Sequence, residues 1–247
     1  MIIKEVYAKS ILSESKVLDY TINPYIGCEH GCTYCYARFI KRFTHHKEKW
    51  GEFVDVKINA PTLLQREVNK KKVGRVWISG LCDPYQPLER KYEITRSCLE
   101  ILLKKNWPVT IQTKSTLILR DVKLLQNHRN IEVTFTITTA DEKIKQIFEP
   151  KAPSIKERVE TLEKLHSAGI KTSVMIAPLL PKAEGLVKEI VGKADYALVD
   201  RMNYHCADWV YKKCGLEYAI RDEFFEKKKL EISETLMKEK IPHEILF

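Results

Sequence analysis

Short runs of β-branched and aromatic residues alternate along the chain with longer segments whose apolar residues recur at helical spacing. The short runs predict strands, because branched side chains fit a pleated surface, and the spaced segments predict helices. Strands are expected around 17–23 and at 75–79, 109–113, 131–138, 171–176 and 196–199. Helices are expected at about 37–49, 94–105, 121–127, 155–168 and 182–193. Strands that alternate with helices in this way predict parallel βαβ units with right-handed crossovers.

This α/β pattern fits an open doubly wound sheet or a partial (β/α)6 barrel of the TIM type with parallel strands. The helix expected at 155–168 has the clearest ends, because Ser154 and Glu157 form a capping box and Gly169 stops it. We expect residues 1–216 to form the barrel. Residues 217–247, a charged amphipathic helix followed by IPHEILF, are expected to form a C-terminal helical cap packed across the barrel or its open edge.

Both architectures place binding and catalytic residues at the carboxyl ends of the strands. Unusual residues follow each predicted strand at that end: GCEHGCTYCYAR at 27–38, GLCDPYQP at 80–87, TKS at 113–115, TTAD at 138–141, APLLP at 177–181 and DRMNYH at 200–205. The sequence therefore predicts a single functional end to which all six loops contribute.

The composition, 44% hydrophobic and 30% charged residues, is typical of a globular protein. The N-terminal sequence MIIKEVYAKSILSESK interrupts its apolar residues with Lys and Glu, so it fits neither a secretory signal nor a membrane span. We expect a monomeric cytoplasmic protein with no membrane association. The net charge of +9 would favour polyanions such as nucleic acid. The basic runs are short and flanked by helical patterns containing Glu, so a solvated helix surface explains most of them.

Three of the seven cysteines, Cys28, Cys32 and Cys35, form a C-x3-C-x2-C pattern. The odd number and the expected reducing compartment argue against a disulfide framework. A structural zinc site needs four ligands, and the nearest candidate, His30, lies between two of the cysteines, where simultaneous ligation is awkward. Iron–sulfur clusters are routinely held by closely spaced thiolates on one loop. Three thiolates on a four-iron cluster leave one iron open to a substrate or cofactor.

The C-x3-C-x2-C pattern on the loop after the first strand, with Tyr34 before its last cysteine, resembles the signature of the radical S-adenosylmethionine (SAM) enzymes. NPYIGCEHGCTYCYAR, GLCDPYQPLE and EPKAPSIKERVETLEKLHSAGIKTSVMIAPLLP further resemble, in order, motifs of the spore photoproduct lyase-like group known as DNA repair photolyases. These motifs span residues 23–181. The resemblance implies the partial barrel and the chemistry more firmly than it implies a substrate.

The resemblance implies a [4Fe–4S] cluster whose ligands are Cys28, Cys32 and Cys35, with SAM bound at the open iron. In that superfamily one electron from the reduced cluster cleaves SAM to methionine and a 5′-deoxyadenosyl radical, which abstracts hydrogen from the substrate. An external one-electron reductant of the flavodoxin or ferredoxin type is therefore expected as a partner.

The resemblance also implies which residues bind SAM. Its amino group is expected near Ser79, Gly80 and Asp83, although DPYQP also fits an ordinary turn and the family's Gly-Gly-Glu form is absent. Its carboxylate is expected at Arg158, whose alternative is an exposed helix arginine paired with Glu160 or Glu157. The remaining candidates are assigned by position alone: Thr113, Lys114 and Thr138 for the ribose or carboxylate, Tyr34 beside the cluster, and Tyr36 near adenine or packed in the core.

Cys82 is a candidate catalytic residue, because the lyase that repairs spore photoproduct uses a cysteine in a comparable region to return hydrogen to its product radical. The alternative is a buried thiol that packs as a small apolar side chain. Tyr204 and His205 are candidates for substrate contact or radical relay, against packing at a strand end. Cys206 and Cys214 are too few for a second cluster.

Three functions stay open on the sequence alone. The first is a radical SAM enzyme that repairs or modifies a macromolecule, with nucleic acid favoured by charge and resemblance. The second is a radical SAM enzyme that modifies or activates a peptide or protein. The third is a non-enzymatic iron–sulfur or zinc module.

Overall fold

The computed structural model describes residues 1–247, which divide into two units. Residues 1–31 and 37–133 form the N-terminal unit, and residues 32–36 and 134–247 form the C-terminal unit. Strand β8 (Ile131–Thr136) crosses the division. This division differs from the boundary expected at residue 216, since residues 217–247 belong to the C-terminal unit.

The N-terminal unit contains strands β2 (Ser13–Glu14), β3 (Tyr20–Ile22), β6 (Val76–Ile78) and β7 (Val109–Thr113), paired in that order. The β3–β6 and β6–β7 pairs are parallel, as the βαβ pattern predicts, and β2 adds antiparallel to β3. The helices of this unit are α2 (Ala60–Glu67), α3 (Glu89–Tyr92), α4 (Ile94–Lys104) and α5 (Val122–Leu125), with a 3-10 segment η2 (Thr116–Asp121) before α5.

A second, three-stranded sheet in the N-terminal unit was not predicted. Strand β5 (Phe53–Lys57) pairs parallel with β1 (Ile2–Val6) and antiparallel with β4 (Tyr25–Ile26). The prediction of a helix at 37–49 is largely wrong: a 3-10 segment η1 (Tyr36–Ile40) continues into α1 (Lys41–Thr44), which ends where His45 adopts a φ of 57°. The chain then turns because His46 is buried, hydrogen-bonds to Glu48 and Asp55, and stacks on a ring of β5.

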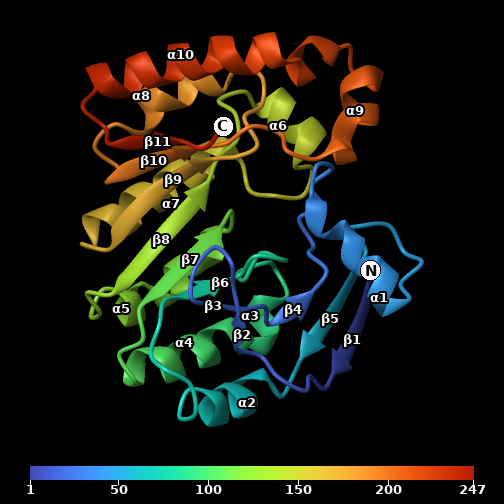
Figure 1. Cartoon of the computed structure of the whole chain (residues 1–247), viewed down its shortest axis with the longest axis vertical. Helices are drawn as coiled ribbons and strands as arrows, with labels where there is room; N and C mark the ends of the chain where they lie inside the picture. The colour runs from blue at the N-terminus through green and yellow to red at the C-terminus, as the bar shows by residue number, and fades with distance from the viewer. The chain divides into compact units, whose positions relative to one another are not determined.

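The C-terminal unit continues with β9 (Lys171–Ile176), β10 (Tyr196–Val199) and β11 (His243–Ile245), in which β10 pairs parallel with both neighbours. Its helices are α6 (Glu142–Phe148), α7 (Ile155–Ser167), α8 (Leu186–Ile190), α9 (Asp208–Lys213) and α10 (Asp222–Lys238). Short 3-10 segments precede three of them: η3 (Ala183–Gly185), η4 (His205–Ala207) and η5 (Glu217–Ile220). The elements are labelled in Figure 1.

Two predictions about this unit have clear outcomes. The capping box of α7 is confirmed, since the Ser154 hydroxyl accepts the Glu157 amide and the Glu157 carboxylate accepts the Ser154 amide. Helix α10 contacts α8 and η3, and part of IPHEILF forms strand β11 beside β10. The predicted helix at 182–193 is shorter and begins with a 3-10 turn.

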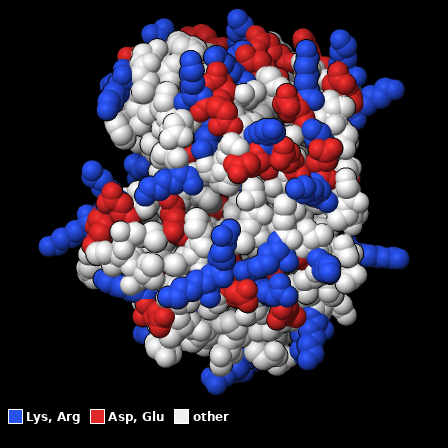
Figure 2. Space-filling view, turned by 180° about the vertical axis from the view of Figure 1, so that it is seen from behind, with Lys and Arg blue, Asp and Glu red and all other residues white.

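In neither unit do the strands close into a ring. None of the helices combines the length and the apolar character that crossing a membrane requires. On the face shown in Figure 2, Lys and Arg side chains are interspersed with Asp and Glu. The excess of positive charge therefore forms no single continuous field on that face.

Candidate functional site

The cysteine loop lies between β4 and η1, and tight turns shape it. Gly31 has a φ of 61° and donates to the carbonyl of Cys28 at 3.2 Å, and Cys35 donates to the carbonyl of Cys32 at 3.2 Å. Cys28 and Cys32 are buried and Cys35 is half-buried, and none forms a disulfide. Cys28 belongs to the N-terminal unit, whereas the other two belong to the C-terminal unit.

In the N-terminal unit, the carboxylate of Asp83 connects the loop after β6 to the end of β7 by hydrogen bonds. It accepts hydrogen bonds from the Thr113 hydroxyl at 2.6 Å, from the Lys114 amide at 2.7 Å and from the Tyr85 amide at 2.9 Å. The bond from Tyr85 two residues on confirms that DPYQP is a turn begun by Asp83. The same carboxylate also binds the loop after β7. Asp83 can therefore begin a turn and still belong to the candidate site.

Asp83 also connects to the cysteine loop within the same unit. Its carboxylate lies 3.2 Å from Nε2 of buried His30, and its amide donates to Sγ of Cys28 at 3.4 Å. Burial alone would raise the pKa of Asp83, but nearby His30 and the hydrogen bonds from Lys114 and Thr113 lower it to about 2. The Asp83 side chain is thus a carboxylate at neutral pH, and His30 serves it as a partner.

Cys82 is buried beside Ser79 in the loop after β6. The Ser79 hydroxyl lies 2.6 Å from Oδ1 of Asn23, which also accepts the Leu81 amide, and 3.1 Å from Sγ of Cys82. An amide oxygen only accepts, so the single hydroxyl proton of Ser79 points to Asn23 and the thiol S–H donates to Ser79. Burial raises the pKa of Cys82 to about 11, so the sulfur carries its hydrogen at neutral pH. Gly80, in the same loop, lies close to the Trp77 ring. A Cβ at position 80 would come within 3.1 Å of that ring, which is a tight contact.

In the C-terminal unit, a buried carboxylate holds the aromatic residue of the cysteine loop. Glu149, at the end of α6, is wholly buried, and its Oε1 accepts hydrogen bonds from the Tyr34 hydroxyl and, at 3.1 Å, from the Thr138 hydroxyl. Its second oxygen lies 2.5 Å from Nη1 of Arg158. Burial raises the pKa of Tyr34 well above its ordinary value, and neighbouring Cys32 and Glu149 raise it further. The phenol is therefore a permanent donor.

Arg158, on α7, has no exposed surface. Its Nε donates to the carbonyl of Pro153 at 2.9 Å and its Nη1 to the carbonyl of Thr136 at 3.3 Å. Its Nη2 is buried without a hydrogen-bond partner. The alternative of an exposed arginine paired with Glu160 or Glu157 is wrong, because Arg158 is buried. Glu160 instead lies 3.9 Å from Lys156, and Glu157 completes the capping box.

The structure stacks Tyr36 on Tyr204, with ring centroids 5.3 Å apart and an interplanar angle of 23°. Both belong to the C-terminal unit, and they are 36% and 53% exposed, so the core-packing alternative for Tyr36 is wrong. His205 is exposed and pairs with Asp208 at 3.0 Å, away from any buried cluster. Cys206 is half-buried and Cys214 exposed.

Sequence reasoning missed Glu149 and Asn23. A single glutamate at a helix end is normally solvated, and its value as a partner appears only when Tyr34, Thr138 and Arg158 converge on it. Asn23 directly follows β3, and its side-chain oxygen accepts a hydrogen bond from the Ser79 hydroxyl. The rule that functional residues lie at strand carboxyl ends would have selected Asn23.

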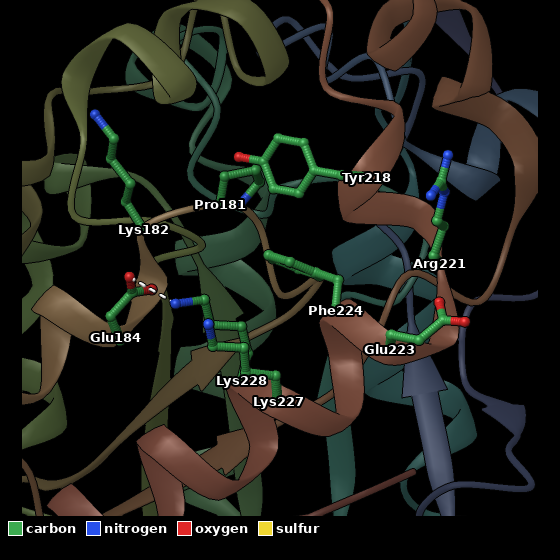
Figure 3. Close-up of a pocket in the computed structure, with 9 residues that line it drawn as sticks. All are labelled: Pro181, Lys182, Glu184, Tyr218, Arg221, Glu223, Phe224, Lys227 and Lys228. Atoms are coloured by element: carbon green, nitrogen blue, oxygen red, sulfur yellow. Dashed lines mark ion pairs between the residues drawn. The ribbon is translucent and has the colours of Figure 1, made fainter.

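A hollow of about 640 Å³ in the C-terminal unit contains none of the predicted site residues. Tyr218, Phe224 and Arg221 line it (Figure 3). Two of its cations are engaged, because Lys228 pairs with Glu184 at 2.8 Å and Lys182 pairs with a carboxylate at 2.6 Å. The hollow therefore has no strong surplus of positive charge.

A model of the radical SAM superfamily matches residues 22–190. The chain belongs to this superfamily. An uncharacterised protein of the archaeon Methanocaldococcus jannaschii is 37% identical over 179 residues, which cover 72% of this chain and 67% of that protein. An uncharacterised protein of Acidianus two-tailed virus is 33% identical over 66% of this chain and 56% of its own length. The chain thus spans about half to two thirds of these relatives.

Two solved structures share the fold of this chain. Spore photoproduct lyase complexed with dinucleoside spore photoproduct superposes with a TM-score of 0.73 over 99% of this chain and 82% of that one, at 14% identity. Streptococcus suis SuiB bound to its precursor peptide SuiA gives a TM-score of 0.58 over 92% and 48%, at 15% identity. These likenesses confirm the predicted α/β fold of the partial barrel type.

Radical SAM enzymes use a [4Fe–4S] cluster and SAM, and superfamily membership gives this chain the same cofactors. The side chains present fit that pair. No three His, Cys, Asp or Glu side chains are gathered for one metal ion, whereas Cys28, Cys32 and Cys35 are closely spaced thiols of one loop and would hold an iron–sulfur cluster. The buried Nη2 of Arg158, which has no protein partner, is the donor that a carboxylate ligand such as that of SAM would need.

Proposed function

We propose that this radical SAM enzyme acts on nucleic acid, in its repair or modification. When bound, the cluster and SAM supply a 5′-deoxyadenosyl radical that abstracts hydrogen from the substrate. The observation that carries the proposal is the buried, protonated thiol of Cys82, which a hydrogen-abstracting enzyme with a lyase-type product radical can use. Superfamily membership favours an enzyme over the non-enzymatic module considered above.

Cys82 would return a hydrogen atom to the product. Its S–H bond breaks as the product C–H bond forms, and a thiyl radical is left on sulfur. One electron from an external carrier of the flavodoxin or ferredoxin type, together with one proton, restores the thiol. Ser79 and Asn23 support this role, because their hydrogen bonds fix the direction of the sulfur.

The remaining site residues would hold the cofactors. We assign Cys28, Cys32 and Cys35 to the cluster. The carbonyls around Ser79 and Gly80 would accept the SAM ammonium group, since the side-chain oxygens of Asp83 already accept several donors. Arg158 would bind the SAM carboxylate through Nη2, with Thr113, Lys114 and Thr138 near the ribose or carboxylate. Tyr34 would position the loop, and the exposed Tyr36–Tyr204 pair would meet adenine or substrate.

Nucleic acid is favoured as substrate by the net charge of +9 and by the fold of a lyase solved with a dinucleoside lesion. A peptide substrate is the second candidate. A radical SAM Nα-GlyT isomerase of Pseudomonas phage M6 is 21% identical over 160 residues, and SuiB is solved with a precursor peptide. The expected monomeric state and cytoplasmic location stay predictions.

The test begins with anaerobic purification, quantification of iron and sulfide, and a dithionite-driven assay for 5′-deoxyadenosine. A protein with a full cluster that never cleaves SAM would overturn the enzymatic proposal. Substrate class is tested by retention on DNA and RNA between about 50 and 200 mM salt, where several phosphate contacts would lower affinity by orders of magnitude. No retention, with SAM cleavage stimulated by peptide pools, would favour the second candidate. Cys82→Ala should leave the iron content unchanged and alter the product distribution.

A further inference from the structure

Two phenylalanine rings lie on the surface just after the cysteine loop. Phe39 in η1 and Phe43 in α1 are 43% and 71% exposed, and their ring centroids are 6.3 Å apart at an interplanar angle of 84°. Burying a phenylalanine side chain stabilises a protein by roughly 1.5–3 kcal/mol, so this unit gains little from these rings by itself. Exposed apolar side chains rimmed by polar ones mark interaction sites.

Two basic residues close to these rings in the sequence have no carboxylate partner. Arg42 is three residues after Phe39 and therefore shares its helical face, and we call Phe39, Arg42 and Phe43 together the Phe39 face. Arg42 is exposed and forms no ion pair, and neither does Lys47 beyond the end of α1. No acidic residue occurs between Glu29 and Glu48 in the sequence.

The basic run of α10 differs in this respect. In α10, Lys227, Lys228 and Lys229 each lie within 3.9 Å of a glutamate of the same helix. Those cations are largely neutralised by their neighbours. The Phe39 face combines two exposed aromatic rings with one uncompensated cation, Arg42, so the partner that fits it carries negative charge around an apolar centre.

We propose that the Phe39 face docks an acidic one-electron carrier protein of the flavodoxin or ferredoxin type, which passes its electron to the cluster. The proposal rests on the proposed function, since a cluster reduced one electron at a time needs such a carrier. Phe39 follows the ligand candidate Cys35 by four residues, which span at most about 14 Å even when fully extended. The carrier loses one electron and the cluster gains it.

The small size of the Phe39 face favours a transiently bound protein as the occupant. Transient redox complexes use small interfaces, and a few aromatic and arginine side chains carry most of the energy of such a contact. Two phenylalanines and one arginine match that need.

The test compares two electron sources for the same enzyme. Phe43→Ser and Arg42→Glu are assayed for 5′-deoxyadenosine formation with dithionite and, separately, with reduced flavodoxin below saturation. We expect the dithionite rate to be unchanged and the flavodoxin rate to fall about tenfold, the effect of one interface contact of moderate strength. Leu230→Ser, which removes a side chain 61% exposed on α10, and Lys70→Glu, which reverses an exposed charge, are the matched controls.

Direct binding of flavodoxin, measured by titration against salt, separates the outcomes. We expect the wild-type affinity to fall as salt rises, and the affinity of Arg42→Glu to be lower and less dependent on salt. Equal losses with dithionite and flavodoxin, or equal effects of the controls, would overturn the proposal. So would loss of DNA retention with unchanged flavodoxin binding, which would assign the face to nucleic acid. If the wild type cleaves no SAM, the binding titration still decides the docking surface while the proposed function fails.

Discussion

Replacing Arg158 by methionine should destabilise the C-terminal unit strongly. The substitution keeps an apolar stem of similar length in place but removes the guanidinium that faces Glu149 at 2.5 Å. Both side chains have no exposed surface, so water cannot replace the lost partner. The carboxylate that remains is shared with the hydroxyls of Tyr34 and Thr138, and the loss therefore reaches the cysteine loop.

The magnitude follows from the burial of the pair. Removing one member of a buried ion pair costs about 3–5 kcal/mol, because an uncompensated charge is left behind. The donors to the carbonyls of Pro153 and Thr136 are lost as well. A domain is stable by only about 5–15 kcal/mol in total, so Arg158→Met would remove a large fraction of the stability.

The assay is urea unfolding of the cluster-free protein without SAM, which isolates the structural role from cofactor binding. We expect Arg158→Met to lower the free energy of unfolding by about 3–5 kcal/mol. Lys156→Met, which removes an exposed pair 3.9 Å long on the same helix, should cause no measurable loss. The double variant Arg158→Met/Glu149→Gln should lose less free energy of unfolding than the sum of the two single losses, because it contains no unpaired charge. A loss below about 1 kcal/mol for Arg158→Met would refute the structural reasoning. If SAM affinity then also fell, Arg158 would serve the cofactor alone.

Three further predictions concern the loops around the site. In the cluster-free protein at pH 8, Cys82 should be alkylated far more slowly than exposed Cys214, because Cys82 is buried and its pKa of about 11 leaves only about a thousandth of its sulfur as thiolate; peptide mass spectrometry measures both rates, and similar rates would contradict the assigned burial. Gly27→Ala should destabilise the protein more than Gly169→Ala. Both glycines have a positive φ, but only at Gly27 would a Cβ come within 2.4 Å of a backbone oxygen. Urea unfolding of the two variants checks this order. Tyr34→Phe should cost about 1.5–3 kcal/mol, the worth of a hydrogen bond to a charged group, and lower the iron content after reconstitution; unchanged values for both would remove Tyr34 from the support of the loop.

The strands could be predicted where branched residues form a run between turn signals. The bounds of β7, β9 and β10 agree with the runs VTIQT, KTSVMI and YALV. Elements fixed by distant partners could not be found in this way. The three residues of β11 become a strand only through pairing with β10, and the expected helix at 37–49 is cut short because buried His46 bonds to Asp55. The local sequence pattern indicates neither the pairing of β11 with β10 nor the bond between His46 and Asp55.

The site shows the same division between local and distant information. Cys28, Cys32 and Cys35 could be selected from spacing alone, because the chemistry of a cluster loop is written in consecutive residues. Asp83 could be selected from its strand-end position. Its partnership with His30, which the sequence offered only as an awkward zinc ligand, depends on two loops meeting in space.

The burial of Arg158 is the instructive case, because the sequence contained the signal for it. The apolar face of α7 includes Ile155 and Leu162, and Arg158 lies three residues after the first and four before the second. That spacing places it on the core side of the helix, where an arginine is stable only with a buried acceptor. The pattern thus requires a carboxylate nearby without saying which one. The structure supplies Glu149, nine residues earlier in the chain, and through it ties α7 to the aromatic residue beside the last cysteine of the loop.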